Sequence, residues 1–299
     1  MISLVEDGSP ELPAVAAALA PYTGNAQVVG LTGSPGVGKS TTTNELVRAL
    51  RAAGRRVGVL AVDPSSPFTG GAILGDRIRM QEHTLDPGVY IRSMSSRGQL
   101  GGLAAATPQA VRVLEGAGCD VVLVETVGVG QAEVEIAAIA DTTLVLLAPG
   151  MGDAIQAVKA GILEIADVFV VNKADRPGAD ATARDIQGML GLAGREPGDW
   201  RPQVIRVTAL RGEGIEDVVA AIEKHRAWLE KTGGLRRRRE ARAAAEVEAI
   251  ALGMLRARMT NLRDGTTLGT LATRVADGDL DPYAAANNLI SGLESPPPR

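Results

Sequence analysis

The stretch Gly33-Ser34-Pro35-Gly36-Val37-Gly38-Lys39-Ser40 decides the fold class of this chain of 299 residues. It fits the phosphate-binding loop pattern G-x-x-x-x-G-K-[ST] at every fixed position. An apolar run at residues 27–31 precedes it, and a helical pattern that reaches Leu50 follows it, which is the strand, loop and helix order that the motif requires. We therefore expect an α/β fold with a mostly parallel sheet flanked by helices, and a nucleoside triphosphate as the ligand.

The parts of this loop have distinct expected roles. Its backbone N–H groups turn toward the phosphates, and the start of the following helix adds positive potential. Lys39 is expected to reach the β- and γ-phosphates and to stabilise charge during catalysis, while the Ser40 hydroxyl is expected to bind Mg²⁺. The predicted phosphate-binding residues are Gly36, Val37, Gly38, Lys39, Ser40 and Thr41.

Three carboxylates are candidate magnesium ligands beside Ser40. Asp63 and Glu125 each end an apolar strand pattern, and Asp76 lies in a glycine-rich stretch. Carboxylates at the carboxyl ends of strands face the ligand crevice of an open α/β sheet. The alternative role for Asp63 and Asp76 is to cap the amino terminus of a helix.

Residues 125–131 (ETVGVGQ) resemble the D-x-x-G switch of GTPases, with Glu125 in the place of the aspartate. The N–H of Gly128 is expected to bond the γ-phosphate and to release it on hydrolysis. Gln131 is a candidate for orienting the attacking water. Packing at a helix amino terminus is its alternative role, because the water-positioning glutamine of Ras-like proteins directly follows the glycine.

The base is predicted by Asn172-Lys173-Ala174-Asp175, which follows a second apolar strand pattern. The Asp175 carboxylate would accept two hydrogen bonds from the N1–H and the 2-amino group of guanine. Adenine lacks this donor pair and would leave the carboxylate unpaired. Lys173 is expected to pack across the base, and Asn172 to tie this segment to the phosphate loop.

A third segment, Thr208, Ala209 and Leu210, follows another apolar strand pattern at the place where GTPases often carry Ser-Ala. We expect the Ala209 N–H to contact the guanine O6. The three segments together predict a GTPase that hydrolyses GTP to GDP and phosphate by in-line attack of water.

Four longer strings resemble one family. They are residues 59–67 (VLAVDPSSP), 70–76 (GGAILGD), 125–131 (ETVGVGQ) and 159–167 (KAGILEIAD). They are similar to the ArgK/MeaB family of P-loop GTPases, relatives of the methylmalonic aciduria type A protein. The resemblance covers residues 1–232 well and the rest more loosely. It implies a SIMIBI-class G domain in a homodimeric GTPase, a chaperone of adenosylcobalamin-dependent acyl-CoA mutases, chiefly methylmalonyl-CoA mutase.

The resemblance also implies a third switch at residues 148–159, which responds to the mutase. Lys159 in this segment is a candidate for stabilising transition-state charge, as an arginine finger does in other GTPases. The alternative for Lys159 is an exposed helix lysine.

Two other functions stay open from the sequence. Similar chains carry an older label as kinases linked to amino-acid transport, against which Asp175 argues because it selects guanine. A metal-delivery GTPase would carry a Cys/His cluster, whereas this chain has only His83, His225 and Cys119. The histidine motif by which mutases bind cobalamin is also absent. We expect both histidines on helix surfaces and Cys119 in the core.

Composition indicates a compact cytoplasmic protein. The net charge of −4 gives no general attraction to nucleic acid. No apolar run reaches the ~18 residues of a membrane span, and the first residues lack the features of a signal peptide.

We expect three parts: a helical extension at residues 1–24, a G domain at 25–232, and a helical arm with a disordered tail at 233–299. A long helix is predicted from Leu235 to about Leu262, and its apolar rows require a partner. The resemblance implies a dimerisation arm; the alternative is that the helix packs back on its own domain. The arginine run 236–239 is expected at a solvated helix start, with contact to RNA or to the mutase as the alternative.

Overall fold

The computed structural model describes residues 1–6, 9–63, 81–83, 85–95, 103–126, 132–150, 163–192, 194, 196, 198–260 and 267–294. Its contacts divide the chain into two compact units, Met1–Ala243 and Ala244–Arg299. The first unit contains the sheet.

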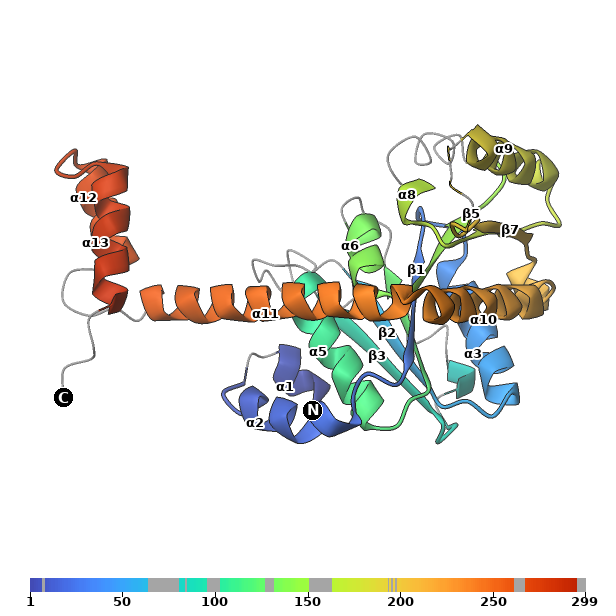
Figure 1. The fold of residues 1–299 in the computed structure, drawn as a ribbon, viewed down its shortest axis with the longest axis horizontal. Helices are drawn as coiled ribbons and strands as arrows, with labels where there is room; N and C mark the ends of the chain where they lie inside the picture. Colours follow the sequence, from blue (N-terminus) through green and yellow to red (C-terminus); the bar gives the residue numbers. More distant parts are fainter. Residues whose placement is uncertain are drawn as a thin grey trace. The chain divides into compact units, whose positions relative to one another are not determined.

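Seven parallel strands form this sheet in the described part of the chain, in the order β3-β2-β4-β1-β5-β6-β7 (Figure 1). Every residue of β1, β4, β5 and β6 is buried, as expected of parallel strands that are covered on both faces. The predicted α/β fold is confirmed. The strands are β1 (Gln27–Thr32), β2 (Val57–Asp63), β3 (Val89–Ser95), β4 (Val121–Thr126), β5 (Thr142–Leu147), β6 (Val168–Val171) and β7 (Gln203–Arg206).

Helices alternate with the strands along the chain. The helices of the first unit are α1 (Ile2–Glu6), α2 (Leu12–Leu19), α3 (Lys39–Ala52), α5 (Leu103–Gly116), α6 (Ala132–Ile139), α8 (Leu163–Ile165), α9 (Ala179–Leu192) and α10 (Ile215–Thr232), with short 3-10 turns η1 (Ala20–Tyr22), η2 (Gln81–His83) and η4 (Ala209–Arg211). Helix α11 (Gly234–Thr260) begins in the first unit and ends in the second.

The helices cover both faces of the sheet, because successive strand residues point to opposite sides. Val29 of β1 packs in one apolar cluster with residues of α3 and α10. Its neighbour Val28 packs in another cluster with residues of α1, α5 and α6. Farther along the sheet, Phe169 of β6 packs with α9. The core therefore consists of two layers, one on each side of the strands.

Strand β1 lies in the middle of the sheet, between β4 and β5. The chain leaves β1 toward β2 on one side and later continues through β5 on the other, so a topological switch point lies at the carboxyl end of β1. Ligands of open α/β sheets bind at such points. Residues 33–38 of the phosphate-binding loop connect β1 to α3 at this place.

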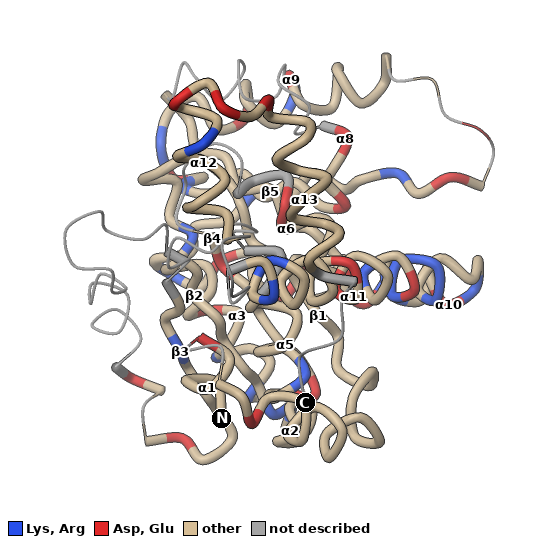
Figure 2. The backbone as a smooth tube through the Cα atoms, turned by 90° about the vertical axis from the view of Figure 1, so that its left-hand side faces the viewer, with Lys and Arg blue, Asp and Glu red and all other residues tan. Residues whose placement is uncertain are grey.

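A buried ionic cluster lies at the opposite edge of the sheet, where β5 and β6 begin. Asp141 and Asp167 immediately precede these strands, and both side chains are buried. Arg239 lies 2.9 Å from Asp141 Oδ2, and Arg238 donates two hydrogen bonds of 2.8 Å to the Asp167 carboxylate. Acidic and basic residues both occur along the neighbouring α10 (Figure 2). The expectation of a solvated arginine run is wrong for these two residues, which anchor the start of α11.

Both histidines are buried, so the expectation that they lie on helix surfaces is wrong. His83 lies in η2 with its Nε2 3.3 Å from the carbonyl oxygen of Asn44. His225 lies on α10 and is fully buried. It lies on the same buried face of α10 as Val218, Ile222 and Leu229.

The surroundings of His225 hold it in the neutral form. Its Nδ1 lies 2.9 Å from Thr142 Oγ1, and its ring packs against Trp200 at a centroid distance of 4.7 Å. Nε2 lies 3.2 Å from Asp167 Oδ1 but lacks the alignment of a hydrogen bond. Burial lowers the pKa of His225 to about 4, and the Arg238 charge adds to this effect, although Asp167 and Asp141 oppose it.

The second unit contains α12 (Leu268–Ala276) and α13 (Pro282–Glu294). They pack on each other through Leu271, Ala285 and Leu289. Thr267 caps α12 by accepting a hydrogen bond from the Thr270 N–H, and the Asp281 carboxylate caps α13. Among the described residues, no helix combines the length and the apolar character that a membrane crossing needs.

Candidate functional site

The phosphate-binding loop follows β1 and requires glycine at specific positions. Gly38 has a φ of 97°, and a Cβ at this residue would lie 2.3 Å from Asn172 Nδ2. Gly33 has a φ of 139°, and a Cβ there would lie 2.3 Å from the Leu146 carbonyl oxygen. Another residue type would be strained at both positions. The glycines therefore allow the loop to approach the end of β5 and the segment that follows β6.

Lys39 is buried at the start of α3 and folds back over the loop. Its Nζ donates hydrogen bonds of 2.5 Å to the carbonyl oxygen of Gly33 and 3.1 Å to that of Ser34. The ammonium thus lies inside the curve of the phosphate-binding loop, where we expect the phosphates.

One amide joins the three segments that the sequence predicts to bind the nucleotide. Asn172 Nδ2 donates a 2.8 Å hydrogen bond to the Val37 carbonyl oxygen, so the predicted link to the phosphate-binding loop is present. Asn172 Oδ1 accepts hydrogen bonds from the N–H groups of Lys173 and Ala209. The segments that follow β1, β6 and β7 therefore meet at one edge of the sheet.

Ala209 lies beside Asn172, and its expected contact with guanine stays a prediction. Its N–H, which we expected to contact the guanine O6, donates to Asn172 Oδ1 at 3.1 Å. This carboxamide oxygen has two lone pairs and accepts from both neighbouring segments. Thr208 pairs with Glu213 through the backbone, and the side chain of Leu210 is exposed beside it.

Lys173 extends along the phosphate-binding loop. It has a φ of 58°, a conformation that costs a residue other than glycine of order 1–3 kcal/mol. Its Nζ donates a 2.6 Å hydrogen bond to the Gly36 carbonyl oxygen. This path leaves the aliphatic part of the side chain available to cover one face of a base.

Asp175, the residue expected to select guanine, lies in the turn that follows Lys173. Its Oδ2 is 3.8 Å from the guanidinium of Arg211, which comes from η4 and lies equally far from Glu213. Arg211 was not identified from the sequence, because it comes from another segment and follows no nucleotide-binding motif. Whether Asp175 selects guanine stays a prediction.

The hydroxyl of Ser40 and the carboxylate of Glu125 meet beside the loop, as predicted for two ligands of one metal ion. Ser40 Oγ donates a 2.7 Å hydrogen bond to Glu125 Oε1, and Glu125 is only 2% exposed. The second oxygen, Oε2, lies 2.8 Å from Thr43 Oγ1. Thr43 was not predicted from the sequence, although its position three residues after Ser40 places it on the same face of α3.

The remaining predicted residues are not all described. Strand β2 ends at Asp63 on the same sheet edge as the end of β4, but the structure describes only its backbone. Asp76, Gly128, Gln131 and Lys159 lie outside the described residues. Their predicted roles in magnesium binding, switching and catalysis stay predictions.

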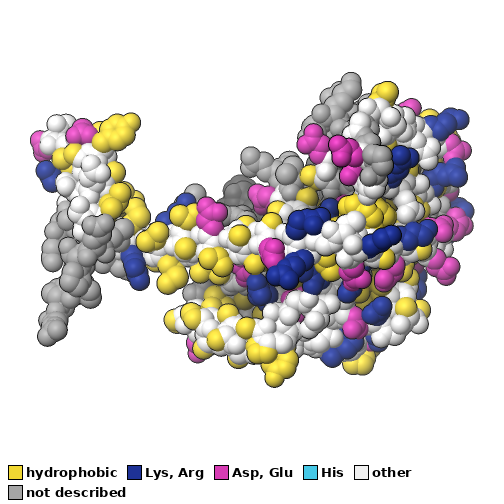
Figure 3. Space-filling view, viewed as in Figure 1, with side chains coloured by type: hydrophobic (Ala, Val, Ile, Leu, Met, Phe, Trp, Pro, Cys, Tyr) yellow, Lys and Arg dark blue, Asp and Glu magenta, His cyan; other side chains and the backbone are white. Residues whose placement is uncertain are grey.

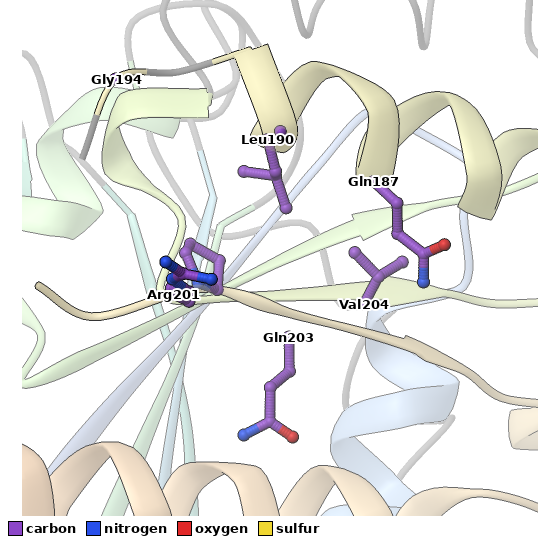
Figure 4. A pocket seen from close by; sticks show the side chains of 8 residues that line it. Gln187, Leu190, Gly194, Arg201, Gln203 and Val204 are labelled. Atoms are coloured by element: carbon purple, nitrogen blue, oxygen red, sulfur yellow. The ribbon is translucent and has the colours of Figure 1, made fainter. Parts of the chain in front are cut away.

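A cavity of about 720 Å³ lies elsewhere, between α9 and β7 (Figure 4). Gln187 and Leu190 of α9 line one side of it, and Gln203 and Val204 of β7 the other. Among the described residues that line the cavity, Arg201 is the one with a charged side chain. The cavity lies at the amino end of β7, away from the segments that follow the strands, so we do not assign the nucleotide to it.

Comparison with known proteins agrees with this arrangement. The family described as "Methylmalonyl Co-A mutase-associated GTPase MeaB" matches residues 1–264. A protein provisionally named a GTPase in Pyrococcus abyssi is 47% identical over 296 residues, which cover 98% of this chain and 91% of that protein. The mouse protein named methylmalonic aciduria type A homolog, mitochondrial, is 37% identical over 272 residues, which cover 89% of this chain and 65% of the mouse protein.

A solved structure supports the same assignment. The crystal structure of a protein named LAO/AO transport system kinase superposes with a TM-score of 0.67 and 28% sequence identity. The superposition covers 98% of this chain and 91% of that one. The chain is therefore a GTPase that belongs to the MeaB family.

Proposed function

We propose that this GTPase is a chaperone of an adenosylcobalamin-dependent acyl-CoA mutase, and that its client is methylmalonyl-CoA mutase. The family description names that mutase as the associated enzyme. The structural observation that carries the nucleotide part of the proposal is the double link made by Asn172. It brings the phosphate-binding loop, the Asp175 turn and η4 into one site. The cytoplasmic location stays a prediction.

The proposed nucleotide complex includes Mg²⁺. Ser40 and Glu125 offer a hydroxyl and a carboxylate 2.7 Å apart, and such hard oxygen donors suit Mg²⁺, which takes further ligands from water and phosphate. The residues therefore fit the ion, with Asp63 and Asp76 as the further candidates from the sequence. When bound at these residues, Mg²⁺ would neutralise the negative charge that develops on the phosphates during hydrolysis.

The groups of the chain bind and orient GTP in this proposal. Lys39 exchanges its hydrogen bonds to the Gly33 and Ser34 carbonyl oxygens for phosphate oxygens, and the loop N–H groups surround the β-phosphate. We expect slow intrinsic turnover that the mutase accelerates. In other GTPases a cation supplied by the same chain or by a partner accelerates hydrolysis by about 10³–10⁵-fold, and Lys159 remains the candidate for such a cation within this chain.

We also propose that the protein forms a homodimer through α11. Within the second unit, Val247, Leu252, Met254 and Leu255 of this helix are all substantially exposed. Apolar side chains lie along the helix in the space-filling view (Figure 3). Exposed apolar rows of this kind mark association surfaces, and a second copy of α11 would cover the row.

The association with the mutase is tested by calorimetric titration of purified methylmalonyl-CoA mutase into the protein loaded with GDP or with a non-hydrolysable GTP analogue. We expect binding whose affinity differs between the two states by about 5–150-fold, the usual range of coupling between two sites. Absence of binding in both states would contradict the assignment of the client. Equal affinity would contradict control by the nucleotide.

The kinase function in the name of the structurally related protein makes a different prediction. γ-labelled GTP would then transfer label to a protein or a small molecule instead of releasing all of it as phosphate. Stoichiometric release of free phosphate, with and without the mutase, would support hydrolysis as the reaction.

A further inference from the structure

Glu125 is held between two hydroxyl groups of the same helix. Its Oε1 accepts a 2.7 Å hydrogen bond from Ser40, and its Oε2 a 2.8 Å hydrogen bond from Thr43. The three residues are buried, and Thr43 is fully so. A carboxylate in such surroundings needs a donor for each oxygen. The two contacts therefore fix both the position and the rotation of the carboxylate plane.

The backbone explains why these groups meet. Strand β4 pairs with β1 so that Glu125 stands opposite Leu31, at the end of the strand that leads into the phosphate-binding loop. Helix α3 begins at Lys39, and residues three apart share one face of a helix. Ser40 and Thr43 are therefore stacked on the face of α3 that meets the end of β4.

The Thr43 hydroxyl has two acceptors within reach and one proton to donate. Besides Glu125 Oε2 at 2.8 Å, it lies 3.0 Å from the Lys39 carbonyl oxygen. The Lys39 carbonyl is part of the helix, where the backbone N–H four residues later is its ordinary partner. A bond to the charged carboxylate is the stronger of the two, so the proton is directed to Glu125.

We propose that Thr43 is a positioning residue for the magnesium carboxylate. Its hydroxyl holds Oε2, so that Oε1 stays directed toward Ser40, where the ion binds together with GTP or GDP. This inference rests on the magnesium site of the proposed function. It assigns to Thr43 an effect on metal affinity that a residue with only a packing role would not have.

Thr42 offers a matched control on the same turn of α3. It too is fully buried, and its hydroxyl donates a 3.0 Å hydrogen bond to the Gly38 carbonyl oxygen. This hydroxyl is therefore directed to the backbone of the loop rather than to the carboxylate. Replacing Thr42 by valine removes a buried hydroxyl and leaves the two hydrogen bonds of Glu125 in place.

The test is the Mg²⁺ dependence of GDP retention. The dissociation of fluorescent N-methylanthraniloyl-GDP from the full chain is followed over a series of Mg²⁺ concentrations, with EDTA as the metal-free end point. We expect Thr43→Val to raise the Mg²⁺ concentration at half-maximal retention by about 10–100-fold, the usual effect of removing an outer-shell partner. Thr43→Ser and Thr42→Val should stay within about threefold of wild type, because the first keeps the hydroxyl and the second leaves Glu125 unchanged.

Several outcomes would overturn the role of Thr43. One is a Mg²⁺ midpoint for Thr43→Val that equals the midpoint of wild type. Another is a Thr42→Val midpoint that shifts as far as the Thr43→Val midpoint. A third is a loss of GDP affinity by Thr43→Val that is as large in EDTA as it is in Mg²⁺. If the valine variant does not fold, Thr43→Cys replaces it, and its weaker donor should give an intermediate shift. If GDP retention by the wild-type protein does not depend on the Mg²⁺ concentration, the magnesium site itself is contradicted.

Discussion

At the scale of single residues, the Asn172 side chain joins three segments of the nucleotide site. Its amide group donates to the loop that follows β1 and accepts from the segment that follows β7. Such a buried polar group, with hydrogen bonds at both its nitrogen and its oxygen, favours one arrangement of its neighbours. The position of Asp175, three residues later, depends on this arrangement.

Replacing Asp175 by asparagine should change the base that the protein selects. The amide oxygen could still accept from N1–H, but an NH₂ donor would replace the oxygen that accepts from the guanine 2-amino group. This donor would suit the 2-oxo group of xanthine instead. We expect the affinity for GTP to fall at least about 100-fold and xanthosine triphosphate to bind in its place. Competition against a fluorescent nucleotide measures both affinities. Asp180→Asn, at an exposed ion pair with Arg206, is the control, and unchanged GTP preference in Asp175→Asn contradicts the role.

The buried His225 predicts a dependence of stability on pH. Its pKa is lowered from 6.5 to about 4 by burial. Between pH 6.5 and pH 4 this histidine is therefore protonated in the unfolded chain but mostly neutral in the folded protein. Stability should therefore fall by about 3 kcal/mol as the pH decreases from 6.5 to 4, and the loss should level off below pH 4. Asp167, Asp141 and Arg238 face the ring and are unchanged in the variant.

The measurement is the free energy of unfolding in urea for wild type and for His225→Gln at several pH values. The difference between the two curves isolates the histidine, since other groups titrate in both proteins. Parallel curves between pH 4 and pH 7 would show that burial does not hold His225 neutral.

The surroundings of some of these residues could have been predicted from the sequence, but those of others could not. His225 follows Val218 and Ile222 of the buried row of α10 at helical spacing, so its burial was available from periodicity. The position of Thr43 on the same face of α3 as Ser40 could also have been predicted from helical spacing. By contrast, Arg238 binds Asp167 from 71 positions away, and no local pattern predicts such a partner.

At the scale of elements, the start of α11 is fixed to the sheet by arginines. Arg239 reaches Asp141 and the carbonyl oxygens of Gly24 and Ala26. Asp141 also accepts a hydrogen bond from the Val28 N–H. The helix therefore continues directly from the edge at which β5 begins.

Replacing Arg239 by alanine should destabilise the protein by about 2 kcal/mol, because a buried carboxylate loses its main partner. Arg236→Ala removes an arginine three positions earlier that is 86% exposed and pairs only with Glu240 in the described ion pairs. It should change stability by less than about 0.5 kcal/mol. Urea unfolding measures both. Equal effects of the two substitutions would mean that the buried pair contributes no more than a surface pair.

The elements that the sequence predicted well are the ones with a clear period. The apolar runs before the three predicted nucleotide-binding segments are strands β1, β6 and β7, and the predicted helical extension at residues 1–24 contains α1 and α2. Strand β3 (Val89–Ser95) was missed. It pairs with β2 alone, and most of its residues are only partly buried, so it shows no continuous apolar run.

At the scale of the whole molecule, the two edges of the sheet serve different purposes. The segments that follow β1, β6 and β7 form the proposed nucleotide site, while the starts of β5 and β6 hold the arginines of α11. Strand β6 has four residues between Asp167 and Asn172, a span of roughly 15 Å. This short connection joins the turn that is proposed to select the base to the arginine contacts at the start of α11.

The proposed homodimer gives a direct prediction. Leu255→Glu, in the exposed apolar row of α11, should convert the dimer to a monomer, because a charge at the centre of an apolar interface would be buried without a partner. Leu85→Glu adds the same charge at another exposed leucine and should leave the dimer intact. Sedimentation velocity distinguishes the two states. A monomeric wild type, or a Leu255→Glu variant that remains dimeric, contradicts this interface.

The activity proposed for this protein is hydrolysis of GTP under the control of a mutase. The most direct measurement is the rate of phosphate release from GTP by the purified protein, with and without methylmalonyl-CoA mutase, and with ATP in parallel. We expect hydrolysis of GTP but not of ATP, and an acceleration by the mutase of at least about tenfold, as for a partner that completes a GTPase site. Equal hydrolysis of the two nucleotides, or a rate for GTP that the mutase leaves unchanged, would contradict it.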